Sequence, residues 1–90
     1  MNNSQYDAVK DLFSELLNSV STEFSEGELG EIYEFIYIAE YGLALQTFID
    51  IVIEEDKRIN NYVVTICEDL AKLMKITDEV NLQAMRNATK

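Results

Sequence analysis

Carboxylates and tyrosines are the side chains in this sequence that could bind a charged partner. Tyr33, Tyr37 and Tyr41 follow one another at four-residue spacing, which places all three on one flank if the segment is a single helix. Glu31 and Glu34 lie beside that row. Tyrosine rings stack on guanidinium groups, and carboxylates accept hydrogen bonds from lysine and arginine. The pattern predicts a surface for a cationic partner, although the same tyrosines could instead fill a gap between two helices with their hydroxyls at the rim.

A second acidic pair, Asp50 and Glu54, is also one helical turn apart, on the same side as Thr47. This pair either continues the acidic surface or forms an ordinary solvated helix face, and we adopt the first interpretation. The predicted partner-binding residues are Glu31, Tyr33, Glu34, Tyr37, Tyr41, Asp50 and Glu54.

Catalytic and metal-binding patterns are missing from the sequence. There is no histidine, the commonest general base, and the only cysteine, Cys67, lies among apolar residues. Neither a glycine-rich phosphate loop nor a dinucleotide-binding fingerprint is present. The acidic run Glu54–Asp56 lacks the alternating acids and central glycine of a calcium loop. We therefore predict no catalytic residue, no metal site and no cofactor, and we do not expect an enzyme.

Charge is distributed very unevenly along the chain. The formal net charge is −10, from 17 acidic and 7 basic residues. Residues 1–56 contain 13 acids and one base, Lys10, which gives −12, and residues 57–90 contain 4 acids and 6 bases, which gives +2. Such a field repels nucleic acid and anionic membranes and attracts basic proteins. We expect a basic partner to dock on the first two thirds of the chain.

The sequence pattern predicts that these residues lie on helices. Ninety residues suffice for one hydrophobic core, so we predict a single domain, residues 1–90. The chain has no proline, only 3 glycines, and apolar residues that recur every three to four positions. Helices are predicted at about residues 4–20, 25–39, 43–56, 61–75 and 78–87. Short links between them predict an all-α protein, a compact antiparallel bundle of four to five helices.

Local signals predict where these helices begin and end. Ser25 and Glu28 have the spacing of a capping box, in which each side chain bonds to the backbone N–H of the other. Gly42 suits the left-handed position that follows the end of the second helix. The expected N-caps are Asn3 or Ser4, Ser25, Asn60 or Asn61, and Thr77.

Apolar stripes on the second and third helices are expected to face the core. The stripe of the second helix consists of Leu29, Ile32, Phe35, Ile36 and Ala39. The main stripe of the third consists of Leu45, Phe48, Ile49 and Val52, widened by Ala44, Ile51 and Ile53. The width of the stripe on the third helix predicts that this helix is central and is contacted from several sides.

The sequence shows no export or membrane signal. The start "MNNSQYDAVKDLF" lacks the basic and apolar regions of a signal peptide. No apolar run approaches the length of a membrane span. With a single cysteine, no internal disulfide is expected, and we predict a cytoplasmic protein.

The stretch "AEYGLALQTFIDIVIEED" resembles the central motif of a family of small bacterial immunity proteins, the MafI type. That family is associated with secreted polymorphic toxins and contact-dependent growth inhibition. In it, a glutamate–tyrosine–glycine–leucine–alanine run opens a helix that ends in acidic residues. Here the run is Glu40–Ala44 and the acidic end is Glu54–Asp56. The similarity covers roughly residues 25–75, and the part from residue 57 onwards fits loosely.

The resemblance implies a cytoplasmic protein that binds its cognate toxin domain, often a nuclease, and blocks it. A nuclease cleft must be cationic to receive nucleic acid, so an acidic helical surface could occupy it as a phosphate mimic. Two other functions stay open. One is a regulatory or adaptor bundle that binds an amphipathic helix, and the other is a subunit of a helical homodimer.

Overall fold

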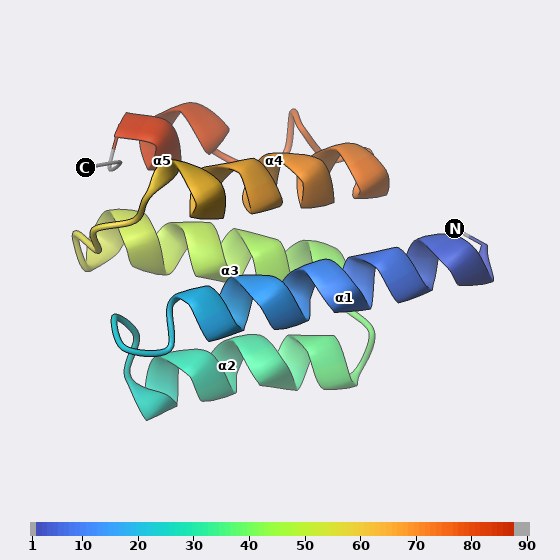
Figure 1. Ribbon diagram of the computed structural model, residues 1–90, viewed down its shortest axis with the longest axis horizontal. Helices are drawn as coiled ribbons and strands as arrows, with labels where there is room; N and C mark the ends of the chain where they lie inside the picture. Colours follow the sequence, from blue (N-terminus) through green and yellow to red (C-terminus); the bar gives the residue numbers. More distant parts are fainter. Residues whose placement is uncertain (1, 88–90) are drawn as a thin grey trace.

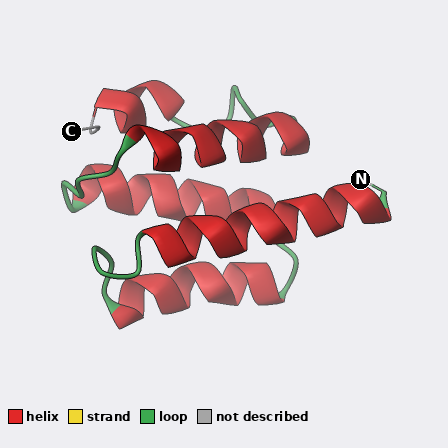
Figure 2. Ribbon diagram, viewed as in Figure 1, coloured by secondary structure: helices red, strands yellow, loops and turns green. Residues whose placement is uncertain are grey.

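Five α-helices follow one another along residues 2–87, the residues that the computed structural model describes. They are α1 (Asn3–Ser19), α2 (Glu26–Tyr37), α3 (Tyr41–Glu54), α4 (Asn61–Met74) and α5 (Leu82–Asn87). Within this range there is no strand, and loops connect the helices (Figure 2). The prediction of an all-α protein is confirmed.

The helices form an antiparallel bundle, as predicted. Figure 1 shows successive helices running in alternating directions, with α1 and α3 in the middle, α2 along the bottom, and α4 and α5 along the top. α2 packs mainly on α3, α1 packs mainly on α4, and α5 packs on α3 and α4. In residues 2–87, none of the helices has both the length and the apolar character needed to cross a lipid bilayer.

The core is centred on α3. Half of this helix is buried, and its predicted main stripe is fully inaccessible to solvent. Phe24, from the loop before α2, stacks on Phe48 of α3 with ring centroids 4.9 Å apart. Neighbours on several sides explain why so wide a stripe is apolar, and the prediction of a central third helix is confirmed. Ile53, predicted to widen the stripe, is instead exposed, because it lies on the side of α3 away from the core.

α2 is an edge helix, and much of it faces outwards. Of its residues, Ile32 alone is buried. Leu29, Phe35 and Ile36 are partly buried against the core, and Ala39 lies beyond the end of the helix and is exposed. The prediction that the whole stripe is buried is therefore wrong for these four residues, because α2 has one principal neighbour, α3.

The start of α2 is closed by the predicted capping box. The Glu28 backbone N–H donates to the Ser25 hydroxyl at 3.1 Å, and the Ser25 backbone N–H donates to the Glu28 carboxylate at 2.8 Å. Asn60 caps α4 in the predicted position, where its side chain accepts a hydrogen bond from the backbone three residues on.

Two other predicted caps are wrong. α1 is capped by Asn2, not by Asn3 or Ser4, because Asn2 is the last residue with extended backbone and its side chain accepts from the first helical turn. α5 begins after Asn81, not after Thr77, because residues 77–79 form a turn of their own. The Asn81 side chain then accepts a hydrogen bond of 3.1 Å from the backbone of residue 84.

Three helices are followed, within two residues, by a residue in the left-handed conformation, and none of these residues is glycine. They are Ala39 (φ 61°), Asp56 (φ 50°) and Lys75 (φ 58°), and each has the paired backbone hydrogen bonds of a Schellman motif. The prediction that Gly42 occupies the left-handed position after α2 is wrong. Gly42 is the second residue of α3, and the chain has already turned at Ala39.

Replacing Phe48 by alanine is expected to lower the free energy of unfolding by about 3–5 kcal/mol, because the substitution leaves a cavity in the centre of the core. Ile53→Ala on the same helix is the control. Ile53 is 39% exposed, so its truncation should change the stability by about 0.5 kcal/mol or less. Urea denaturation followed by circular dichroism measures both, and equal losses would contradict the central position of Phe48.

Candidate partner-binding site

An acidic groove runs between α2 and α3. The helices are antiparallel, so the first half of α2 lies beside the second half of α3 (Figure 1). The groove has a volume of about 260 Å³, and no basic residue lines it. Its lining residues are Glu28, Glu31, Thr47, Asp50, Ile51, Glu54 and Glu55. Five of these seven side chains are carboxylates, contributed by both helices and by the turn after α3.

The groove brings together three of the residues that the sequence predicts as partner-binding: Glu31, Asp50 and Glu54. Sequence analysis missed Glu28 and Glu55. The signal for Glu28 was its position one helical turn before Glu31, which places both carboxylates on one side of the helix in addition to the role of Glu28 in the capping box. Glu55 directly follows α3, and only the packing of the two helices shows that it turns towards the groove.

Lys57 neutralises one end of the acidic groove. Its ammonium nitrogen lies 2.9 Å from the Glu28 carboxylate, donates to the Glu23 carbonyl oxygen at 3.0 Å, and lies 5.4 Å from the centre of the Phe24 ring. The hydrogen bond from the Ser25 backbone and the interactions with Lys57 lower the pKa of the Glu28 carboxyl. Lys57 therefore fastens the start of α2 to the segment that follows α3.

The other carboxylates of the groove have no basic partner among residues 2–87. The second ion pair in this range joins Arg86 and Glu68, neither of which lines the groove. The unpaired groove acids are Glu31, Asp50, Glu54 and Glu55. Like charges gathered in one groove repel one another and raise the local attraction for cations. The groove is therefore suited to several cationic groups of a partner.

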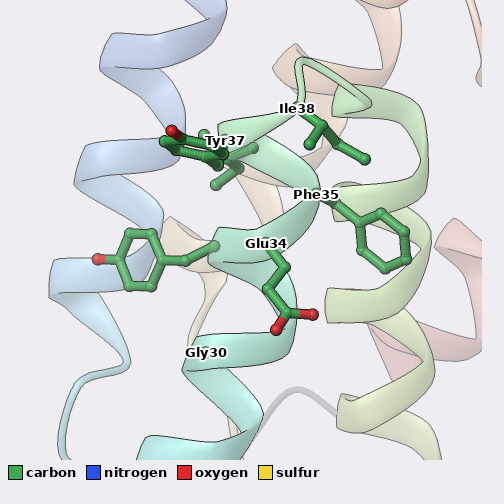
Figure 3. A pocket seen from close by; sticks show the side chains of 7 residues that line it. Gly30, Glu34, Phe35, Tyr37 and Ile38 are labelled. Carbon is green, nitrogen blue, oxygen red and sulfur yellow. The ribbon is translucent and has the colours of Figure 1, made fainter.

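An apolar depression, here called the α2 patch, lies on the outer face of α2. It has a volume of about 690 Å³. Its lining residues are Gly30, Tyr33, Glu34, Phe35, Ile36, Tyr37 and Ile38. Figure 3 shows Tyr37 on the side of α2 towards α1, Phe35 on the side towards α3, and Glu34 between them. Tyr37 is 90% exposed, Ile38 61% and Tyr33 51%.

The α2 patch has the composition of an interaction surface. Large apolar and tyrosine side chains exposed together are common where proteins bind other proteins, and tyrosine is enriched at binding hot spots. The patch contains three of the predicted partner-binding residues: Tyr33, Glu34 and Tyr37. Glu34 of the patch is one helical turn from Glu31 of the acidic groove, so the two surfaces adjoin along α2.

Tyr41 is a core residue, and its assignment to the exposed tyrosine row is wrong. It is 6% exposed, with its ring centroid 6.0 Å from that of Tyr6 and 6.2 Å from that of Phe13, both on α1. The four-residue spacing does not continue past Tyr37, because α2 ends there and Tyr41 opens α3. For Tyr41, the alternative of filling a gap between helices is the correct one.

Comparison of the chain with family models, with curated proteins and with solved structures finds no match. Among the residues that the structure describes, no three His, Cys, Asp or Glu side chains are placed so that they could hold a metal ion.

Tyr41→Ala is expected to lower the free energy of unfolding by about 3–5 kcal/mol, because it removes a buried ring that packs between α1 and α3. Tyr37→Ala should change the stability by only about 0.5 kcal/mol, because that ring is almost fully exposed. Urea titration of the two variants beside the wild type measures the difference. If both variants lose the same stability, Tyr37 is also a packing residue.

The ion pair of Glu28 predicts a pH dependence of stability. Glu28→Gln keeps the acceptor of the capping box and removes the charge. Because the folded-state pKa of Glu28 lies below its ordinary value of 4.5, the ionised carboxylate stabilises the fold above pH 4.5, and this contribution is lost as the pH falls through the lowered pKa. The wild type should be more stable than the variant at neutral pH, and the difference should shrink in acid. Urea denaturation at a series of pH values measures it, and a constant difference would contradict the assignment.

Proposed function

We propose that this chain is an immunity protein that binds and neutralises a cognate bacterial toxin domain, a nuclease with a basic cleft, in the cytoplasm. The observation that carries the proposal is the acidic groove, whose carboxylates other than Glu28 have no basic partner within residues 2–87. The charge of −12 on residues 1–56 supports a basic partner. The resemblance of Glu40–Asp56 to the MafI-type motif is consistent with the same function.

In this proposal the acidic groove imitates the nucleic acid that the toxin would bind. A nuclease presents lysines and arginines to the phosphate backbone of its substrate. Asp50 and Glu54 offer carboxylates in their place, four residues apart on one helix face, about 6 Å along the axis. A side-chain carboxylate on a folded helix contains no phosphodiester bond, so the toxin has nothing to cleave. Substrate is excluded for as long as the groove occupies the cleft.

The construction of the groove favours tight binding. Its two walls are helices of a packed bundle, and the start of α2 is held by the capping box and by Lys57. The backbone that carries these carboxylates needs little further ordering when a partner arrives, so less conformational entropy is lost on binding than with carboxylates on a flexible loop. The negative field of the first 56 residues should also steer a basic domain towards the groove and raise the association rate.

The test begins with the reading frame beside this chain's gene, where a secreted toxin with a basic C-terminal domain is expected. That domain, produced together with this chain, should co-purify with it and show no nuclease activity until the two are separated. The association rate constant should fall steeply with salt, while the dissociation rate constant changes less. Absence of binding at low ionic strength, or a bound toxin whose nuclease activity is undiminished, would overturn the proposal.

Asp50→Lys is expected to weaken binding of the toxin domain by about tenfold or more, because it places a cation among the carboxylates that face the cleft. Asp11→Lys, the same charge change on the exposed surface of α1, is the matched control and should change the dissociation constant by about twofold at most. Surface plasmon resonance at two salt concentrations measures both variants. Equal effects would mean that net charge alone, and not the groove, determines affinity.

A further inference from the structure

We propose that the α2 patch is a seat for one α-helix of the partner, an amphipathic helix with an apolar stripe and basic flanks. The inference rests on the proposed function for the identity of the partner, and it adds the kind of element that is recognised. It concerns a surface that the acidic groove does not include: an apolar depression formed along consecutive turns of one exposed helix.

The shape of the α2 patch suits a helix laid against it. Figure 3 shows Tyr37 on one side of α2 and Phe35 and Ile38 on the other, with Glu34 between them and Gly30 one turn below. Tyr37 thus borders the depression on one side, Phe35 and Ile38 border it on the other, and the Glu34 carboxylate lies between them. An incoming helix can place an apolar stripe at three- and four-residue spacing into such a depression.

The position of Gly30 is the feature that the fold itself does not explain. Glycine in the interior of a helix costs about 1 kcal/mol relative to alanine. A Cβ added at Gly30 would meet no atom within 4 Å, so packing within the chain does not require glycine there. The left-handed positions that do favour glycine are filled by Ala39, Asp56 and Lys75 instead. A missing side chain at the floor of the patch lets the backbone of a partner approach α2 closely.

The charge of α2 decides which occupant fits. α2 contains four glutamates and no base, and they are Glu26, Glu28, Glu31 and Glu34. If the α2 helices of two copies packed against each other, their glutamates would repel one another, which opposes a homodimer through this face. A helix with a lysine or arginine next to its apolar stripe would instead bring a cation to Glu34, in the middle of the α2 patch, and another to Glu31 at the adjoining groove.

The experiment uses a fluorescently labelled peptide of about 18 residues, five helical turns, with leucines at helical spacing and lysines and arginines on both flanks. Fluorescence anisotropy with the full-length chain should show saturable binding. Two control peptides should bind at least about tenfold more weakly. One has glutamates in place of the bases, and the other has the same composition in scrambled order, without a stripe.

Two variants of the chain test the location. Tyr37→Ala removes a wall of the α2 patch, and Gly30→Gln fills its floor while favouring the helix, so the melting temperature should rise as binding falls. Each should weaken peptide binding by about tenfold or more. Tyr62→Ala, at a tyrosine of α4 that is 53% exposed, is the matched control and should leave binding unchanged. Equal binding by the scrambled peptide, or unchanged affinity in Tyr37→Ala and Gly30→Gln, would overturn the inference.

The same variants separate this inference from the proposed function. If the toxin domain is bound and inhibited, and Tyr37→Ala and Gly30→Gln do not affect it, the proposed function stands and the helix seat is wrong. If the amphipathic peptide binds as described and no toxin domain does, the helix seat stands, the proposed function fails, and an adaptor role takes its place.

Discussion

The packing of α2 along α3 is the contact on which both candidate surfaces depend. α3 is held in the centre by its buried stripe, and α2 is attached to it through Ile32 and a few partly buried side chains. Because α2 has no other principal neighbour, its outer face stays exposed, and two of its glutamates, Glu28 and Glu31, lie beside the acids of α3. Separating the two helices would disperse the acidic groove and leave the α2 patch without support.

The carboxylates of the acidic groove lower the stability of the fold and at the same time create its attraction for cations. Carboxylates that share a groove repel one another, and interspersed bases would relieve this, yet nearly all the bases of the chain follow residue 56. Lys57 offsets the repulsion at one end, where it also holds the loop before α2 in place. The fold tolerates the remaining repulsion because its hydrophobic core, centred on Phe48, stabilises it.

Gly30 and Ala39 are also not the most stabilising residues for their positions. Alanine would stabilise the helix at position 30, and glycine would fit the positive φ at position 39 better.

Much of the fold was predictable because it depends on residues close together in the sequence. The capping box of Ser25 and Glu28 spans three residues, and the buried stripe around Phe48 follows from helical periodicity alone. Of the acids predicted to form one surface, Glu31, Asp50 and Glu54 line the groove between α2 and α3, while Glu34 lies in the adjoining α2 patch. Helix ends were less predictable, because several residues compete for each terminal position.

The helical class, the acidic first two thirds and the central third helix could all be read from the order of residues, because periodicity and charge content are properties of the chain itself. The end of the tyrosine row could not, because it depends on how the helices pack. The turn at Ala39 moves Tyr41 onto α3, where its ring packs against α1. The antiparallel register of α2 and α3 likewise brought Glu28 and Glu55 into one groove. Contacts between separate helices depend on how the whole core packs, and no local pattern contains that information.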